Sequence, residues 1–165
     1  MVIASKEQAY EYLQLAEKAL LQYQDSAESY IGHCLNVAKA ARLIAEQYQN
    51  LDDDTAEIFG LLHDIGKINY ESICKRHHSV TGYEYMMGEG YSDIARICLT
   101  HTFPLKYFDE ITEEFFFHNK VDIAFVLDFL NNNEMNKYDE IIQIADIISM
   151  PKGFATIDAR FADII

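Results

Sequence analysis

The chain has 165 residues, a length that suits one domain with a hydrophobic core of its own. It carries 27 acidic and 13 basic residues, and the net charge of −14 argues against a nucleic-acid-binding surface because phosphates would be repelled. Half of the residues are apolar and they are spread throughout the chain, which argues against disorder.

The cysteines and the apolar runs indicate where such a protein resides. The three cysteines, Cys34, Cys74 and Cys98, have no CxxC spacing, which predicts free thiols in a reducing compartment. No apolar run reaches membrane-spanning length, and the N-terminal stretch MVIASKEQAYEYL lacks the apolar core of a signal peptide. We therefore expect a cytoplasmic protein with no membrane partner.

Helical periodicity and capping residues define the predicted elements. Helices are predicted over residues 5–23, 26–49, 52–64, 79–87, 92–102, 119–131 and 136–149, with a short one in 156–165. Ser5 and Gln8 form a capping-box pattern, and Ser26 and Ser92 are the expected N-caps of later helices. Gly66 is the expected C-terminal signal of the helix over 52–64.

No segment predicts a β-strand. The sequence has no clear period-two alternation and no Asn-Gly or Asp-Gly hairpin signal. We therefore predict an all-α fold, a single-domain bundle of about six to eight helices. The domain is expected to span residues 1–165, with its core in 26–150, an N-terminal helix over 5–23 and a C-terminal tail over 151–165.

Several polar side chains interrupt apolar helix stripes. They are His33, His63, Asp64, His101 and Asp146, on four predicted helices. A lone inward histidine is usually a hydrogen-bonded core residue, and a lone aspartate often caps a neighbouring helix. Together, three imidazoles and two carboxylates would be costly as separate buried groups, whereas a shared divalent cation satisfies all of them. Nitrogen and carboxylate ligands without thiolate suit iron, manganese, cobalt, nickel or zinc.

These residues also match a known family. The order His33, His63-Asp64, Asp146, with LLHDIGK after an amphipathic helix and a downstream IADII, resembles the H…HD…D signature of the HD-domain superfamily of metal-dependent phosphohydrolases. The resemblance covers about residues 26–150. It implies a helical domain with a metal among its helices, for which these four residues are ligands.

Some members of this superfamily bind two metal ions and use two more histidines. His78 precedes Gly82 in an HxxxG pattern, and His101 ends the following helix. The resemblance therefore implies a binuclear variety, in which Asp64 bridges the two ions. His77 is the competing candidate for the place of His78. Iron or manganese is the favoured metal, with cobalt, nickel and zinc as alternatives.

Further residues are candidates for the chemistry and for anion binding. Asp64 is the candidate proton acceptor for a metal-activated water. Lys67 lies one turn beyond the metal ligands and is a candidate for contact with a phosphate, the alternative being a solvated lysine at a helix C-terminus. Lys75 and Arg76 extend a locally basic stretch, and Lys106 is a second candidate anion contact or a solvated loop lysine.

The resemblance implies hydrolysis of a phosphate ester or anhydride, with a nucleotide or dinucleoside polyphosphate as the expected anionic substrate. The stretch HTFPLKYF lacks the HHExxDGxGYP continuation of the cyclic dinucleotide phosphodiesterases, which disfavours that activity. Two alternatives remain: a di-iron oxygenase of the same superfamily, and a non-catalytic nucleotide sensor with a structural metal. A homodimer is also an open alternative.

Overall fold

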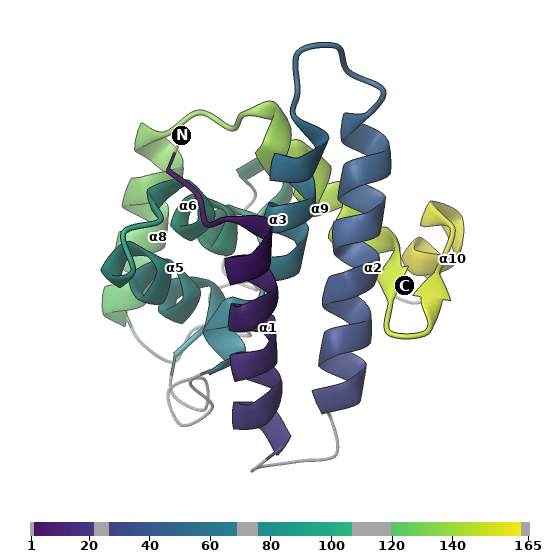
Figure 1. Ribbon diagram of the computed structural model, residues 1–165. Coiled ribbons are helices and arrows are strands. Elements are labelled where there is room, and N and C mark those ends of the chain that lie inside the picture. Colours follow the sequence, from purple (N-terminus) through teal and green to yellow (C-terminus); the bar gives the residue numbers. More distant parts are fainter. Residues whose placement is uncertain (1, 22–26, 69–75, 107–119, 163–165) are drawn as a thin grey trace.

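The computed structural model describes residues 2–21, 27–68, 76–106 and 120–162 (Figure 1). Its elements are α1 (Lys6–Leu21), α2 (Ala27–Ala45), α3 (Asp53–Leu62), the 3-10 helix η1 (Ile65–Ile68), α5 (His78–Gly88), α6 (Ser92–Thr100), the 3-10 helix η2 (Pro104–Lys106), α8 (Lys120–Asn132), α9 (Lys137–Ile148), β1 (Ser149–Met150), β2 (Gly153–Phe154) and α10 (Ile157–Ala162). The predicted all-α fold is confirmed, with eight α-helices in these four stretches of chain.

Local capping explains where α1 begins, but it does not explain where α6 begins. The predicted capping box is present: Gln8 Oε1 accepts from the Ser5 amide at 2.8 Å, and Ser5 Oγ accepts from the Gln8 amide at 3.2 Å. The prediction for Ser92 was wrong, because Ser92 is already helical and the N-cap is Tyr91, which makes no side-chain capping bond. Ser26 lies outside the described residues.

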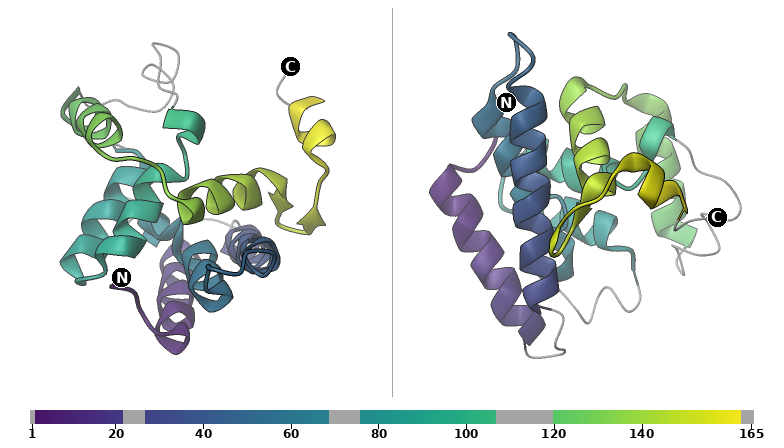
Figure 2. Two further views of the ribbon diagram at one scale, coloured as in Figure 1. Left: turned by 90° about the horizontal axis from the view of Figure 1, so that it is seen from above. Right: turned by 90° about the vertical axis from the view of Figure 1, so that its right-hand side faces the viewer.

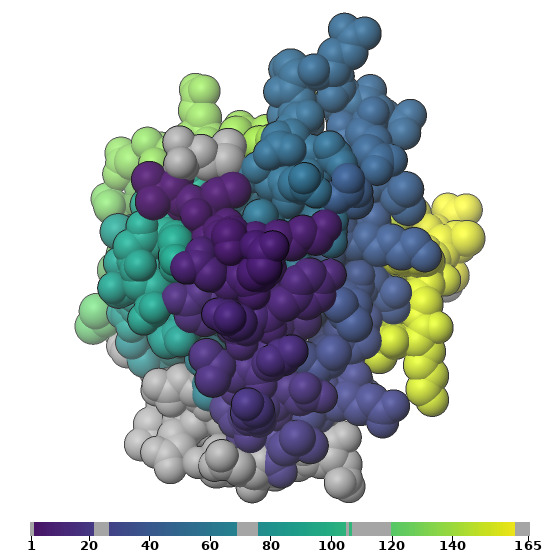
Figure 3. Space-filling model, in the orientation of Figure 1, coloured from purple at the N-terminus to yellow at the C-terminus, as the bar shows by residue number. Residues whose placement is uncertain are grey.

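The helices pack in two groups around a common interior. The helices α1, α2 and α3 contact one another, and α5 pairs with α6 (Figure 1). The space-filling view shows α1 covering the face turned to the viewer, with α2 beside it (Figure 3). Gly60 allows the close approach of α3 to α2, because a Cβ there would lie 2.5 Å from Ala38 Cα. A second apolar cluster joins α5 and α6 to α8.

Helix α9 links these two groups. It contacts α2 and α3 on one side and α6 on the other, and its C-terminal end leads into the β1–β2 hairpin (Figure 2). Its N-terminus carries a capping box between Asn136 and Asp139. Any side chain on the inner face of α9 is therefore placed between the two helix groups, where the candidate site lies.

The hairpin is a correction to the sequence analysis, which predicted no strands. Strands β1 and β2 pair antiparallel, with Ser149 opposite Phe154 and Met150 opposite Gly153. Each strand is two residues long, so no alternation is detectable, and the positive φ of 146° at Gly153 is the one local signal. Asn36 on α2 donates to the Met150 carbonyl at 2.7 Å, which holds the hairpin against α2.

None of the described helices combines the length and the apolar character needed to cross a bilayer.

Candidate metal centre

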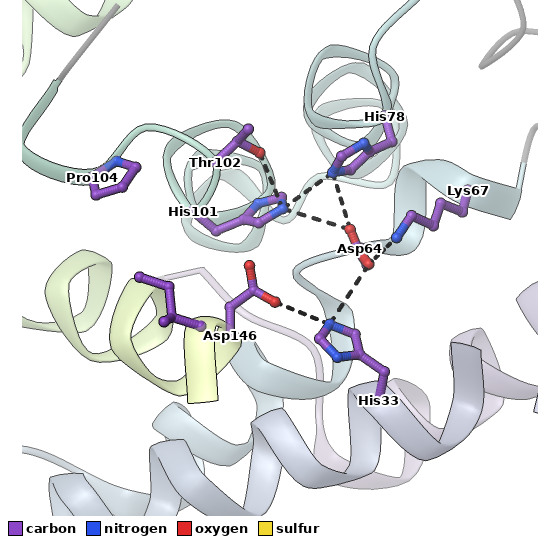
Figure 4. A pocket seen from close by; sticks show the side chains of 9 residues that line it. His33, Asp64, Lys67, His78, His101, Thr102, Pro104 and Asp146 are labelled. Carbon is purple, nitrogen blue, oxygen red and sulfur yellow. Dashed lines mark hydrogen bonds and ion pairs between the residues drawn. The ribbon is translucent and has the colours of Figure 1, made fainter. Parts of the chain in front are cut away.

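Five of the six predicted ligands line one pocket (Figure 4), and the sixth, His63, is buried and lies in the same groups of potential metal ligands. The six come from five different places in the fold. They are His33 on α2, His63 and Asp64 directly after α3, His78 at the start of α5, His101 directly after α6, and Asp146 on α9. The cavity has a volume of about 270 Å³. Residues that lie far apart in sequence thus meet at the end of the two helix groups.

The first group of ligand atoms lies between α2, α3 and α9. The Nε2 atoms of His33 and His63 are 3.2 Å apart. Asp146 Oδ1 lies 3.0 Å from His33 Nε2 and 3.6 Å from His63 Nε2. Asp64 Oδ2 is 4.0 Å and 3.6 Å from the same two nitrogens. Two imidazole nitrogens and two carboxylate oxygens therefore face a common point.

The second group lies between α5 and α6. His78 Nε2 and His101 Nε2 are 3.2 Å apart. Asp64 Oδ1 lies 3.1 Å from His78 Nε2 and 3.5 Å from His101 Nε2. The two oxygens of the Asp64 carboxylate thus face different ways, with Oδ2 toward His33 and Oδ1 toward His78 and His101 (Figure 4). His101 also lies within ligand distance of His63 and Asp146, so the two groups adjoin.

Backbone carbonyls fix three of the four imidazoles. His33 Nδ1 lies 3.2 Å from the Ser149 carbonyl, His63 Nδ1 lies 2.8 Å from the Gly60 carbonyl, and His101 Nδ1 lies 3.2 Å from the Ile97 carbonyl. A carbonyl oxygen only accepts, so each Nδ1 carries the proton and each Nε2 presents its lone pair to the pocket. This is the tautomer that a histidine needs in order to bind a metal through Nε2.

The two carboxylates are held in their charged forms. Burial disfavours the ionisation of Asp64, but the charge of Lys67 outweighs it and holds the pKa of this carboxyl well below its usual range. Burial also opposes ionisation of Asp146, but the neighbouring imidazoles of His33 and His63 outweigh it, so the pKa of Asp146 is likewise lowered. Both side chains are therefore carboxylates at neutral pH, the state in which they bind cations.

Lys67 lies beside the ligands, in η1. Its ammonium forms an ion pair with Asp64 Oδ2 and lies 6.0 Å from the centre of the Tyr30 ring. Burial lowers the pKa of Lys67, but the neighbouring Asp64 carboxylate outweighs this effect and raises it. Lys67 also lines the pocket, so it presents a permanent positive charge at the edge of the ligand cluster.

The structure distinguishes His78 from His77. The His77 ring caps α5, and its Nδ1 accepts from the Ser79 amide at 3.3 Å. The ring of His78 points to Asp64, and His77 stacks behind it with the ring centres 4.2 Å apart. Burial lowers the pKa of both imidazoles, that of His77 to about 2. Among the described residues, the groups that can hold a metal include His78 and omit His77.

The two outer candidates for anion binding do not join this cluster. The Arg76 guanidinium binds the buried Asp122 carboxylate at 2.7 Å and the Glu84 carboxylate at 2.7 Å. Lys106 lies at the end of η2 with a positive φ of 58°. Neither side chain is among the residues that line the described pocket, and Lys75 lies outside the described residues.

Three pocket residues were not identified from the sequence: Thr102, Pro104 and Ile147. The sequence analysis selected titratable side chains on the apolar stripes of helices. Thr102 lies beyond the end of α6 and therefore belongs to no helix stripe. Its position directly after His101 is the available signal. Thr102 Oγ1 lies 3.2 Å from His101 Nε2, so its hydroxyl faces the second ligand group.

Gly66 has a different role from the one predicted. It has no positive φ, and the chain continues through it as η1. A Cβ on Gly66 would lie 2.0 Å from the His78 carbonyl oxygen and 2.6 Å from the Gly82 nitrogen. The Thr81 hydroxyl donates to the Gly66 carbonyl at 3.2 Å. Gly66 is therefore needed for the contact of η1 with the first turn of α5, which brings His78 to Asp64.

Comparison with known proteins agrees with this arrangement. The family model described as the HD domain matches residues 30–150, which is most of the chain. No curated protein and no solved structure matches the chain. The match spans His33, His63-Asp64 and Asp146, and the same residues form the histidine and aspartate groups that can hold a metal. The chain therefore belongs to the HD-domain family of metal-dependent phosphohydrolases.

Proposed function

We propose that the protein hydrolyses phosphate esters or anhydrides at a centre that binds two divalent cations. The observation that carries this proposal is the placement of the Asp64 carboxylate, whose Oδ2 faces the Nε2 atoms of His33 and His63 and whose Oδ1 faces those of His78 and His101. A structural site for one metal ion needs only one group of ligands, and when those ligands fill every coordination position no water can bind. Two groups that share one carboxylate, open to a cavity of about 270 Å³, suit a pair of catalytic ions instead.

The ligand set fits iron or manganese, since it consists of imidazoles and carboxylates with no thiolate. When bound, such cations polarise a phosphoryl oxygen and lower the pKa of a coordinated water. His33, His63 and Asp146 would hold one ion, and His78 and His101 would hold the other. Asp64 serves both.

The lowered pKa of Asp64 supports a role as a bridging ligand more than a role as a proton acceptor.

Lys67 is the candidate contact for the phosphoryl group. Its ammonium lies at the pocket wall and is kept protonated by Asp64. With that carboxylate engaged by cations, the ammonium is available to a phosphate oxygen, which it would orient and whose charge it would offset. Of the described residues that line the pocket, Lys67 is the only one with a basic aliphatic side chain.

The proposed substrate is a small anionic phosphate compound, with a nucleotide or dinucleoside polyphosphate as the first class to screen. A cavity of about 270 Å³ is at the lower end for ligand sites, which suits a phosphoryl group and part of its substituent. The rest of a nucleotide would extend outside the cavity. The strong negative charge of the protein as a whole makes local cations necessary for binding any such anion.

The test combines metal analysis with phosphate release. Untagged protein is reconstituted with iron or manganese, its metal content is measured, and inorganic phosphate release is screened over nucleotides and dinucleoside polyphosphates. We expect about two ions per chain, and loss of both metal and phosphate release in Asp64→Asn. The matched control is Asp158→Asn, which removes an exposed carboxylate in α10 and is expected to change neither.

Other outcomes distinguish the alternatives. Dioxygen consumption without phosphate release would support a di-iron oxygenase. Nucleotide binding without turnover would support a sensor. Failure to bind any metal after reconstitution, or phosphate release that persists in Asp64→Asn, would overturn the proposal.

A further inference from the structure

A buried glutamine on α9 holds the backbone turn that carries one of the candidate ligands. Gln143 is 6% exposed, and its Nε2 donates to the Thr100 carbonyl at 2.9 Å and to the Phe103 carbonyl at 3.3 Å. These two carbonyls flank His101 and Thr102. The two carbonyls also accept from the backbone amides of Phe103 and Lys106, each at 3.1 Å, and the Gln143 carboxamide adds the bonds that tie this turn to α9.

The same helix face carries a candidate ligand of the other group. Gln143 and Asp146 are three residues apart on α9 and so lie on neighbouring positions of one face. Asp146 faces His33 and His63, whereas Gln143 binds the turn that carries His101. Helix α9 and the Gln143 carboxamide therefore connect Asp146 to the turn that carries His101.

A separate contact sets the register of α6 against α9. Asp139 is fully buried and accepts from the Thr100 hydroxyl at 2.6 Å and from the Arg96 guanidinium at 2.7 Å. This network anchors the body of α6, but it does not bind the backbone carbonyls that enclose His101. In contrast to Asp139, the Gln143 carboxamide binds backbone carbonyls of the turn that follows α6.

We propose that Gln143 is a positioning residue of the metal centre, and that its carboxamide fixes the turn carrying His101 at the distance from Asp146 that lets the second ion bind. This inference rests on the proposed binuclear function. Without the two hydrogen bonds, the turn is free to relax away from α9. His101 Nε2 then moves relative to Asp64 Oδ1, which lies 3.5 Å from it. His33, His63, Asp146 and the Oδ2 atom of Asp64 form a ligand group without His101, and this group is expected to keep its ion.

The test is a cobalt titration followed by visible absorption, with no substrate present. In Gln143→Met, which keeps the length of the side chain but removes its N–H donors, we expect one tight equivalent of Co²⁺ and a second that binds about 10–100-fold more weakly than in the wild type. Unchanged binding of both equivalents would overturn the inference.

The matched control is Thr100→Val, which breaks the hydroxyl contact with Asp139 on the same helix pair. It is expected to lower the unfolding midpoint and to leave both cobalt equivalents unchanged. Equal weakening of the second equivalent in this control would mean that general loosening of α6 is the cause, and it would overturn the specific role of Gln143. If Gln143→Met is insoluble, Gln143→Asn keeps the amide on a shorter side chain, and the same selective weakening is expected.

The titration separates the two proposals. A wild-type protein that binds fewer than two equivalents would overturn the binuclear site and this inference with it. A wild-type protein that binds two equivalents, together with a Gln143→Met variant that does the same, would overturn this inference alone.

Discussion

Replacing Gly66 by alanine is expected to push the backbones of η1 and α5 apart. The second ligand group, formed by His78, His101 and Asp64 Oδ1, depends on their close contact. The glycine lies in η1, between Asp64 and the first turn of α5. A Cβ at this position would come within 2.0 Å of the His78 carbonyl oxygen and within 2.6 Å of the Gly82 nitrogen. Both are backbone atoms, so no side-chain rotation can remove the overlap.

The size of the effect follows from these distances. Ordinary contact requires η1 and α5 to move apart by roughly 1 Å or more, and overpacking of this kind costs about 1–3 kcal/mol of unfolding free energy. Because His78 begins α5, the same movement takes His78 Nε2 away from Asp64 Oδ1, which is now 3.1 Å from it. A misplacement of about 1 Å can cost on the order of 100-fold in activity.

Urea unfolding and cobalt titration measure the two effects separately. Gly66→Ala is expected to unfold at lower urea and to bind the second Co²⁺ equivalent more weakly. The control is Gly88→Ala in α5, the helix that Gly66 packs against, where a Cβ would meet nothing within 4 Å. That change is expected to raise stability by about 0.4–1 kcal/mol and leave cobalt binding unchanged. A Gly66→Ala protein with wild-type stability and cobalt affinity would refute the reasoning.

Three further predictions concern the ligands and the stability of the fold. His78→Ala is expected to lose one cobalt equivalent, whereas His77→Ala keeps both; equal losses would contradict the assignment. Chelation of the metal is expected to lower the melting temperature, and free Mn²⁺ at 100 times its dissociation constant adds about 2.7 kcal/mol; melting that is independent of metal would contradict a native site. Glu57→Gln removes a carboxylate that accepts from Lys6 at 2.6 Å and Arg42 at 2.7 Å, and should cost about 1–3 kcal/mol at pH 7. Burial raises the pKa of Glu57, but these two cations outweigh it and lower the pKa, so the stabilisation is present above the ordinary value of 4.5 and lost as pH falls through the lowered one. Urea unfolding at several pH values checks this, and a difference from wild type that persists in acid would contradict it.

The candidate ligands could be predicted because each departs from its local pattern. A histidine or aspartate within an apolar helix stripe implies a buried polar group, and burial without a partner is costly. Several such residues in one short chain imply a shared partner, which is how His33, His63, Asp64, His101 and Asp146 were selected together. The HxxxG pattern of the family resemblance added His78, and the sequence left His77 as its competitor.

The basic residues show where this reasoning fails. Lys67 lies close in sequence to His63 and Asp64, and Arg76 lies beside His77, and both were selected for their charge and this proximity. Lys67 follows the ligands by one turn and reaches the pocket, while Arg76 binds Asp122, a residue 46 positions later. A cation binds the carboxylate that the fold places beside it, and sequence proximity does not reveal that carboxylate.

The sequence by itself determined the all-α class and the chemical types at the site. Capping residues and helical periodicity are local properties, so α1 and the all-α class could be predicted without any tertiary contact. The tertiary structure alone decided which Asp64 oxygen faces which imidazole pair, why Gly66 must lack a side chain, and that Gln143 holds the turn of His101. These features depend on distances between backbones that are far apart in the chain, and no local pattern encodes such a distance.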